Sequence, residues 1–322
     1  MLNAFYLVAG IALLLAGGHW LVAGSVTIAR RLGVSTLVVG LTIVAMGTSA
    51  PELAFNVIAA TGGHAELSFG NIVGSNIANI GLVLGITVLI WPLAVHSRVI
   101  SRELPWLVVV SLVACAVPFL PFGPGGFNRF GGAVMLAWFV LFMVSWYRLG
   151  RSMPTDPLVK DLGQEAEAET VGSMGGAVAL LLIGLVMLAG GGKLSEVGAV
   201  GIARSLGLTE GLIGLTIVAL ATSLPELTTC VIACRKGHHD LAVGNIVGSN
   251  IFNLLLVLGL TAVITPVPLP ENGVWDLLAM IAITCLLWGM ALTHRYTLAR
   301  YEGAALLLCY LGYMTWSVLR EV

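Results

Sequence analysis

The chain has 322 residues, of which 58% are apolar and only 10% are charged, whereas soluble domains average about 45–50% apolar and about 25% charged residues. The balance of 15 Lys and Arg against 16 Asp and Glu excludes a strongly basic nucleic-acid binder, and the apolar excess excludes a disordered chain. The composition predicts a membrane protein whose main partner is the lipid bilayer, and it implies no obligate protein partner.

In chain order, the first apolar run begins directly after Met1-Leu2-Asn3, with no basic segment before it, and continues to Leu21. We therefore interpret it as a membrane span and not as a cleaved signal peptide. Trp106 and Trp146 lie near predicted span ends and are expected to anchor helices at the membrane surface. Because a span needs about 20 mostly apolar residues, ten stretches qualify: 4–26, 34–60, 68–92, 104–121, 128–147, 174–194, 209–233, 241–266, 274–293 and 301–319.

A polar stretch over residues 148–173 holds the acidic tract of the chain, and we predict a cytoplasmic linker there between a first half, 1–147, and a second half, 174–322. Loops rich in Lys and Arg face the cytoplasm, so ten spans place both termini outside, in a multi-pass protein of the cell (inner) membrane. Alternate loops hold 11 of the 15 basic residues: Arg30, Arg31, Arg98, Arg102, Arg148, Arg151, Lys160, Arg235, Lys236, Arg295 and Arg300.

The two halves repeat each other. A shift of 174 residues superimposes residues 40–87 on residues 214–261 without a gap, with identical residues at 31 of 48 positions. Each half holds five predicted spans, and an odd number inserts the second half upside down relative to the first. Inverted repeats are typical of transporters, whose substrate sites lie at the midplane between them. We predict an all-α membrane protein with ten transmembrane helices in two inverted five-helix repeats, with broken helices at the midplane.

Glu52 and Glu226 occupy the same repeat position, and we expect them to be the only acidic residues deep inside spans. A carboxylate at the bilayer centre is costly and indicates function. Two neighbouring carboxylates would repel each other and take up protons, whereas one divalent cation would neutralise both. No Lys or Arg lies near the middle of these predicted spans to form a salt bridge. The pair therefore predicts a cation site.

Each Glu ends a motif that exposes backbone, Gly47-Thr48-Ser49-Ala50-Pro51-Glu52 in the first half and Ala221-Thr222-Ser223-Leu224-Pro225-Glu226 in the second. Proline inside a helix removes one hydrogen bond and blocks another, and freed carbonyls at membrane depth must face protein, water or a cation. Hydroxyl, carbonyl and carboxylate oxygens are the ligands that calcium and sodium prefer. The alternative is a kink that serves packing alone.

The next span of each half begins with a second motif, Gly70-Asn71-Ile72-Val73-Gly74-Ser75-Asn76 or Gly244-Asn245-Ile246-Val247-Gly248-Ser249-Asn250. The paired glycines have the spacing of close helix packing. Asn71 and Asn245 could equally be ligands or bond the broken helix. Polar residues four positions apart form a stripe, and its candidate cation ligands are Ser75, Asn79, Ser249 and Asn253.

With these motifs the chain resembles the calcium/cation antiporter superfamily, in particular the prokaryotic sodium/calcium exchangers, over essentially its whole length. The resemblance implies a secondary antiporter that exchanges calcium for sodium and needs no cofactor besides the transported ions. Calcium would be held by Glu52 and Glu226 with the backbone of Thr48 and Thr222. The first and sixth helices would slide against the others. Sodium sites would use the Ala45 carbonyl, Ser49 and Ser75 in one half, the Ala219 carbonyl, Ser223 and Ser249 in the other, and Asn79 and Asn253 in the middle.

One position departs from the family pattern, because many members carry Asp where this chain has Asn253, which leaves two formal charges at the site. A proton/calcium antiporter on the same scaffold is the alternative. That branch of the superfamily usually has a carboxylate in the second motif, where this chain has Gly74-Ser75-Asn76, so sodium is favoured. A channel is disfavoured by inverted broken helices. An enzyme is disfavoured because no span pairs His with Glu at a catalytic spacing.

Overall fold

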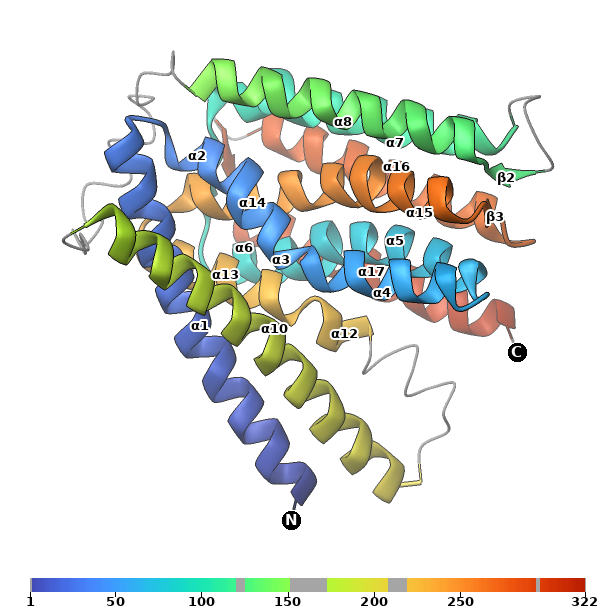
Figure 1. Cartoon of the computed structure of the whole chain (residues 1–322), viewed down its shortest axis with the longest axis horizontal. Helices are drawn as coiled ribbons and strands as arrows, with labels where there is room; N and C mark the ends of the chain where they lie inside the picture. Colours follow the sequence, from blue (N-terminus) through green and yellow to red (C-terminus); the bar gives the residue numbers. More distant parts are fainter. Residues whose placement is uncertain (1, 120–124, 151–172, 208–218, 294–295, 322) are drawn as a thin grey trace.

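The computed structural model describes residues 2–119, 125–150, 173–207, 219–293 and 296–321, and its long elements are all helices (Figure 1). Eight helices in these residues are long and apolar enough to cross a membrane, and a bent pair, Thr36–Thr48 with Ala50–Thr61, makes a ninth if it is one span. The predicted span 209–233 lies partly outside the described residues. The all-helical membrane class is confirmed, whereas the count of ten spans stays a prediction.

The first half starts with a long helix, continues through a broken one, and ends in two oblique helices. Its elements are α1 (Leu2–Leu32), α2 (Thr36–Val39), η1 (Gly40–Val44), α3 (Ala45–Thr48), α4 (Ala50–Thr61), α5 (Ala65–Ala78), η2 (Asn79–Leu84), α6 (Gly85–Ile90), β1 (Leu93–Ala94), η3 (Val99–Glu103), α7 (Leu104–Ala116), η4 (Val117–Phe119), β2 (Gly126–Phe127) and α8 (Arg129–Gly150).

The second half follows the same order. Its elements are α10 (Met174–Ser205), α12 (Ala219–Thr222), α13 (Leu224–Arg235), α14 (His239–Phe252), η6 (Asn253–Val257), α15 (Leu258–Ile264), β3 (Val267–Pro268), α16 (Gly273–Leu292), β4 (Thr297–Leu298) and α17 (Arg300–Glu321). The helix predicted over 174–194 is longer than expected. Its extension keeps Lys193 and Glu196 paired at 2.8 Å, one turn apart, and it stops before Gly207, whose φ of +81° ends a helix without strain.

Helices α1 and α10 lie antiparallel and side by side, crossing the other helices obliquely (Figure 1). Glycines at seven-residue intervals form their contact. A Cβ built on Gly10 would lie 2.7 Å from the Gly191 carbonyl, and one built on Gly17 would lie 2.9 Å from the Gly184 carbonyl. The two backbones therefore touch, as they do where small residues line helix pairs in membranes.

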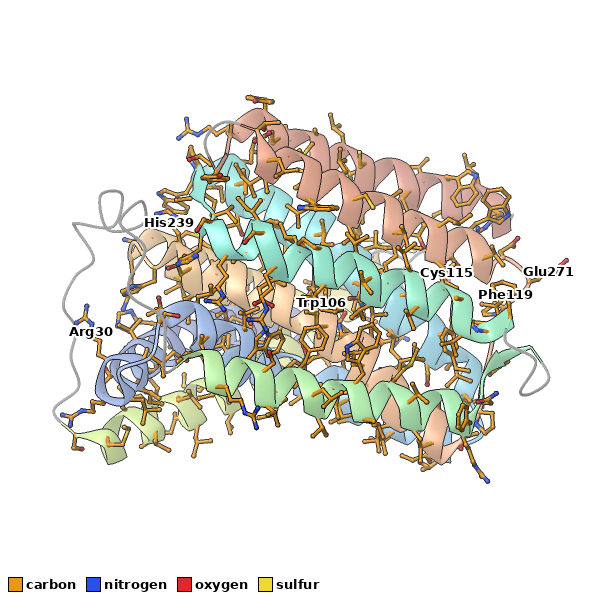
Figure 2. All side chains as sticks on the ribbon, turned by 90° about the horizontal axis from the view of Figure 1, so that it is seen from above. Arg30, Trp106, Cys115, Phe119, His239 and Glu271 are labelled. Carbon is orange, nitrogen blue, oxygen red and sulfur yellow. The ribbon has the colours of Figure 1, made fainter. Side chains whose placement is uncertain are left out.

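Two short antiparallel ribbons join the halves. Strand β1 pairs with β4, placing Leu93 opposite Leu298, and β2 pairs with β3, placing Phe127 opposite Val267. The β1–β4 pairing brings together two loops that we predicted to be cytoplasmic. Figure 2 agrees with this alternation, because Arg30 and His239 lie toward one end of the molecule and Phe119 and Glu271 toward the other.

One expectation about span ends is wrong. Trp146 is no surface anchor, because it is 0% exposed and its Nε1–H donates to Glu103 Oε2 at 2.9 Å. Glu103 is buried too, but it lies at the start of its span, Val99–Phe119. That helix starts with a π-helical turn at Val99, five residues before the predicted start. This start carries Glu103 inward beside α8, where the Trp146 indole bonds Oε2 and Arg102 Nε lies 3.9 Å from Oε1.

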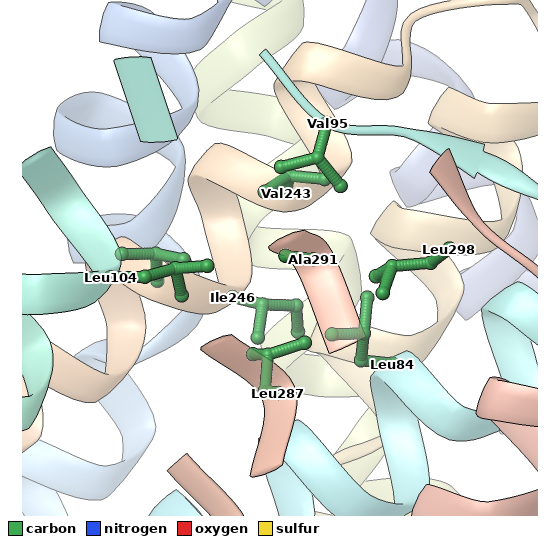
Figure 3. A pocket seen from close by; sticks show the side chains of 9 residues that line it. Leu84, Val95, Leu104, Val243, Ile246, Leu287, Ala291 and Leu298 are labelled. Carbon is green, nitrogen blue, oxygen red and sulfur yellow. The ribbon is translucent and has the colours of Figure 1, made fainter. Parts of the chain in front are cut away.

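Around α14 the interior packs without polar groups on one side. Val243, Ile246 and Val247 of α14 meet Leu104 and Leu287 around a void of about 10 Å³ (Figure 3). A void at the lower size limit for one water, with no polar group to bind it, stays dry. Val95 and Leu298, next to the β1–β4 ribbon, also line it.

Close packing of α14 on the first half predicts a stability effect. A Cβ on Gly244 would lie 2.7 Å from the Leu37 carbonyl, so Gly244→Ala should destabilise the protein by about 1–3 kcal/mol through overpacking. The matched control is Gly289→Ala, whose Cβ meets nothing within 4 Å. Thermal unfolding in detergent should show a lower midpoint for Gly244→Ala only. Equal midpoints for the two variants would contradict this packing.

Candidate functional site

Both proline motifs break a helix at a serine. Ser49 has φ −85° and ψ +4°, and the helices on its two sides meet at a 42° bend. Ser223 has nearly the same angles, φ −89° and ψ 0°. The Ala45 carbonyl is less free than expected, because it accepts the Ser49 N–H at 3.0 Å. In the second half the Ser223 N–H instead donates to Leu220 at 3.2 Å, so the two breaks are related but not identical.

The two breaks place a carboxylate in the first turn of α4 and of α13. Glu52 is 4% exposed and Glu226 is 1% exposed. They lie close enough for their charges to interact. A helix N-terminus favours negative charge, but this partial charge does not neutralise two carboxylates. The sequence prediction that the two acids meet inside the protein is supported by this geometry.

Contacts between the halves run through Thr48. Its hydroxyl donates to Asn245 Oδ1 at 3.1 Å and lies 3.4 Å from Ser249 Oγ. Gly248 permits this approach because it has no Cβ: one built there would lie only 2.7 Å from the Ala45 Cβ. The tip of α3 from the first half therefore rests on α14 of the second. The prediction of glycine-mediated packing is confirmed here.

The first-half glycines, Gly70 and Gly74, behave differently. A Cβ built on either one meets nothing within 4 Å among the described residues. In the second half Gly244 packs on Gly40. The repeat counterpart of Gly40 is Gly214, which lies outside the described residues. Packing on Gly70 and Gly74 therefore stays a prediction.

Asparagines form the second link between the halves. Asn79 Nδ2 donates to Asn250 Oδ1 at 3.1 Å, and Asn250 Nδ2 donates to the Asn76 carbonyl at 3.3 Å. Asn79 and Asn253 each open a π-helical segment, η2 and η6. Wide turns of this kind are frequent at functional sites. Hydropathy does not predict that the two π-helical segments begin at the same repeat position.

Sequence reasoning missed Asn56 and Asn250 as members of this network. Asn56 Nδ2 donates to the Glu52 carbonyl at 2.7 Å and to Asn71 Oδ1 at 2.8 Å. Asn71 therefore bonds the broken helix, which was one of the two alternatives left open for it. The signal for Asn250 was present, because it ends the repeated motif, whereas Asn56 has Cys230 as its counterpart and left no repeat signal.

The remaining predicted residues occupy the same region. Ser75, Ser223, Ser249 and Asn253 are buried. Thr222 ends α12 and Ala219 begins it. By the 174-residue shift, the contacts of Thr222 that would mirror those of Thr48 are with Asn71 and Ser75 of α5, and α12 lies against α5. The set predicted from sequence thus converges in one buried region, but ion coordination by any member stays a prediction.

Several buried oxygens in this region have no hydrogen-bond partner among the described residues. They are Ser49 Oγ, Glu52 Oε2, Glu226 Oε2 and Asn253 Oδ1. Buried polar atoms are nearly always paired, so such a cluster requires an explanation. All four are oxygens, the donor type of calcium and sodium. Within the described part of the chain, no three His, Cys, Asp or Glu residues group as they would for a transition metal.

A family model described as sodium/calcium exchanger protein matches residues 2–147 and 176–319. A relative from Alkalimonas amylolytica, provisionally named as an antiporter, CaxA, is 40% identical over 317 residues, which are 97% of this chain and 98% of the relative. The inner membrane protein YrbG of Escherichia coli is 37% identical over 83% of this chain and 81% of its own length. The sodium/calcium exchanger MaX1 of Methanosarcina acetivorans is 28% identical over 97% of both chains.

Among solved structures, the sodium-calcium exchanger NCX_Mj superimposes with a TM-score of 0.83 and 29% identity, over 98% of both chains. The family match covers both halves and both pairs of motifs around Glu52 and Glu226. The family is one of exchangers, which move ions across membranes, and the described residues hold eight helices long and apolar enough to cross one. The chain belongs to the sodium/calcium exchanger protein family.

Proposed function

We propose that this protein is a secondary antiporter that exchanges calcium for sodium by alternating access. The observation that carries the proposal is the cluster of unpartnered buried oxygens around Glu52 and Glu226, built from both halves of the chain. A buried charge costs about 3 kcal/mol at the bilayer centre. The empty, doubly charged site should therefore cross the membrane poorly, and this penalty couples the two ion fluxes.

In this proposal calcium lies between Glu52 and Glu226, with the backbone of Thr48 and Thr222 completing its shell. The hydroxyl of Thr48 is engaged with Asn245, which is consistent with a backbone role. Sodium ions use oxygens on both sides of calcium, and Asn79 and Asn253 close the cluster between them. The sodium ligands are the Ala45 carbonyl, Ser49 and Ser75, and the Ala219 carbonyl, Ser223 and Ser249.

The proposed scaffold has ten spans in two inverted halves, 1–147 and 174–322, joined by a cytoplasmic linker at 148–173, with both termini outside. The two strand pairings support this scaffold, because the repeat relates one pairing to the other. Leu93 pairs with Leu298, and its repeat counterpart Val267 pairs with Phe127. The name of the relative YrbG, an inner membrane protein, supports location in the cell (inner) membrane.

Sliding of α1 and α10 is the movement proposed for alternating access. Their glycine contact supports motion as one body, since the two backbones touch at Gly10 and Gly17. Against the other helices α1 presents Gly18, whose Cβ would meet the ends of two flexible side chains, Ile232 and Thr228. That boundary is softer and is the one expected to shift.

Sodium dependence is the first prediction. Proteoliposomes loaded with sodium should take up radioactive calcium when diluted into sodium-free buffer, whereas vesicles loaded with potassium should not. A pH gradient is imposed separately in both kinds of vesicle. Uptake driven by the pH gradient alone would overturn sodium coupling and favour the proton/calcium alternative. No calcium movement under any gradient would overturn the proposed substrate.

Removal of either buried carboxylate is the second prediction. Glu52→Gln or Glu226→Gln leaves a single charge, so calcium uptake should fall by at least about 30-fold, equivalent to about 2 kcal/mol of lost charge pairing. Glu196→Gln is the matched control, because Glu196 pairs with Lys193 on α10. Similar rates for all three variants would exclude the two carboxylates as the calcium ligands.

Acid inhibition is the third prediction. Protons neutralise the carboxylates and so remove the attraction for calcium, whereas loss of protons restores it. Calcium uptake at saturating sodium should therefore decline as pH falls from about 8 to 6, because paired buried carboxylates take up protons readily. Raising calcium should partly reverse the decline. A flat profile over this range would contradict competition between protons and calcium.

A further inference from the structure

A cavity of about 210 Å³ lies between α16 and α17, and Ile77 of α5 forms its floor. Its walls are Ala279, Ala282 and Ile283 of α16, and Cys309 and Tyr313 of α17. Ala282 and Cys309 are also exposed, so the cavity opens to the outside of the helix bundle. Its lining is apolar except for the phenol of Tyr313, whose OH is engaged with Asp276 at 3.2 Å.

The surface around the opening faces the bilayer. Both helices are candidate membrane spans. Their outward positions carry large apolar side chains, among them Leu278 on α16, 45% exposed, and Leu308 and Leu311 on α17. The cavity is therefore continuous with the lipid-facing surface of a membrane protein.

The first half has the counterpart of this cavity between α7 and α8. The starts of α8 and α17 correspond, since Arg129-Phe130-Gly131-Gly132-Ala133 matches Arg300-Tyr301-Glu302-Gly303-Ala304. Helices α7 and α16 correspond through Ser111 and Thr284, whose hydroxyls donate to the carbonyls of Leu107 and Met280 four residues earlier. In this register the counterparts of Ala279, Cys309 and Tyr313 are Trp106, Trp138 and Phe142.

In the first half these three rings fill the space. Trp106 projects between α7 and α8 (Figure 2). Its ring centroid lies 6.3 Å from that of Trp138 and 5.8 Å from that of Phe142, both edge to face. The second half replaces the two indoles by a methyl group and a thiol. The cavity is open because this half lacks the side chains that would close it.

We infer that the cavity binds one acyl chain of a membrane phospholipid. An unfilled apolar cavity is unfavourable, and water gains no hydrogen bonds there. The opening is continuous with the bilayer, whose acyl chains are flexible, apolar and present at high concentration. The bound chain takes the place that Trp106 and Trp138 hold in the first half, and it supports α5 at Ile77, two residues from both Ser75 and Asn79.

Photolabelling tests this inference on the full-length protein. The protein is reconstituted in phosphatidylcholine containing a fraction of the same lipid with a diazirine within the acyl chain, irradiated, and mapped by peptide mass spectrometry. Label is expected at Cys309 and Tyr313, on the wall of the cavity. In Ala279→Trp, which restores the indole of the first half, this label should fall severalfold.

The matched control is Leu278→Trp, which adds an indole one residue away, on the lipid-facing side of α16. It should leave the labelling of Cys309 and Tyr313 unchanged. Equal labelling in Ala279→Trp and Leu278→Trp would overturn the inference, because the label would then report only the outer surface of the helices.

Two further variants guard against a folding defect in Ala279→Trp. Cys309→Trp restores the counterpart of Trp138 from the other wall and should also lower the label at Tyr313. Trp138→Cys removes an indole from the filled site and should create a new labelled peptide between α7 and α8. Unchanged labelling in both variants would overturn the inference independently of Ala279→Trp.

Discussion

The burial of two like charges in the middle of a membrane protein is the constraint on which the rest of the structure depends. Glu52 and Glu226 interact with each other, and neither has a basic partner among the described ion pairs. Such a pair must take up protons or bind a cation. Both helices break at the serine three residues before the carboxylate, and Thr48 links the two halves there through Asn245 and Ser249. In the proposed exchange the transported cations supply the positive charge.

Small residues make this arrangement possible. The tip of α3 reaches Asn245 and Ser249 only because Gly244 and Gly248 let its backbone lie against α14. The same device joins α1 to α10 through Gly10, Gly17 and their repeat counterparts. Lipid gives helices no hydrophobic reason to associate, so close backbone contact and interhelical hydrogen bonds take that role. Glycine content, high for a helical protein, is therefore tied to the site and to the packing of α1 on α10.

The two halves have diverged around the central carboxylates. Next to Glu52, Asn56 bonds Asn71, whereas its counterpart Cys230 accepts a weaker bond from Asn245 at 3.6 Å. Trp106 and Trp138 fill the groove between α7 and α8, whereas alanine and cysteine leave the groove between α16 and α17 open. Related backbones thus carry different side chains around a common centre. In the proposed alternating access, identical halves would give inward and outward states of equal energy, and these differences would make the two energies unequal.

The sequence alone determined the class of the protein, the repeat and the identity of the central pair. Those features are local: apolar runs of span length, a gapless 174-residue shift, and carboxylates without basic neighbours. Sequence reasoning failed where long-range packing decides the position of a side chain. The inward turn of Glu103 depends on the Trp146 indole of another helix, and Asn56 joins the site through Asn71, fifteen residues away. The π-helical turns at Asn79 and Asn253 leave no hydropathy signal, because they arise when neighbouring helices hold a polar residue toward the centre. Only the tertiary structure could decide which oxygens remain unpartnered, since that depends on both halves at once.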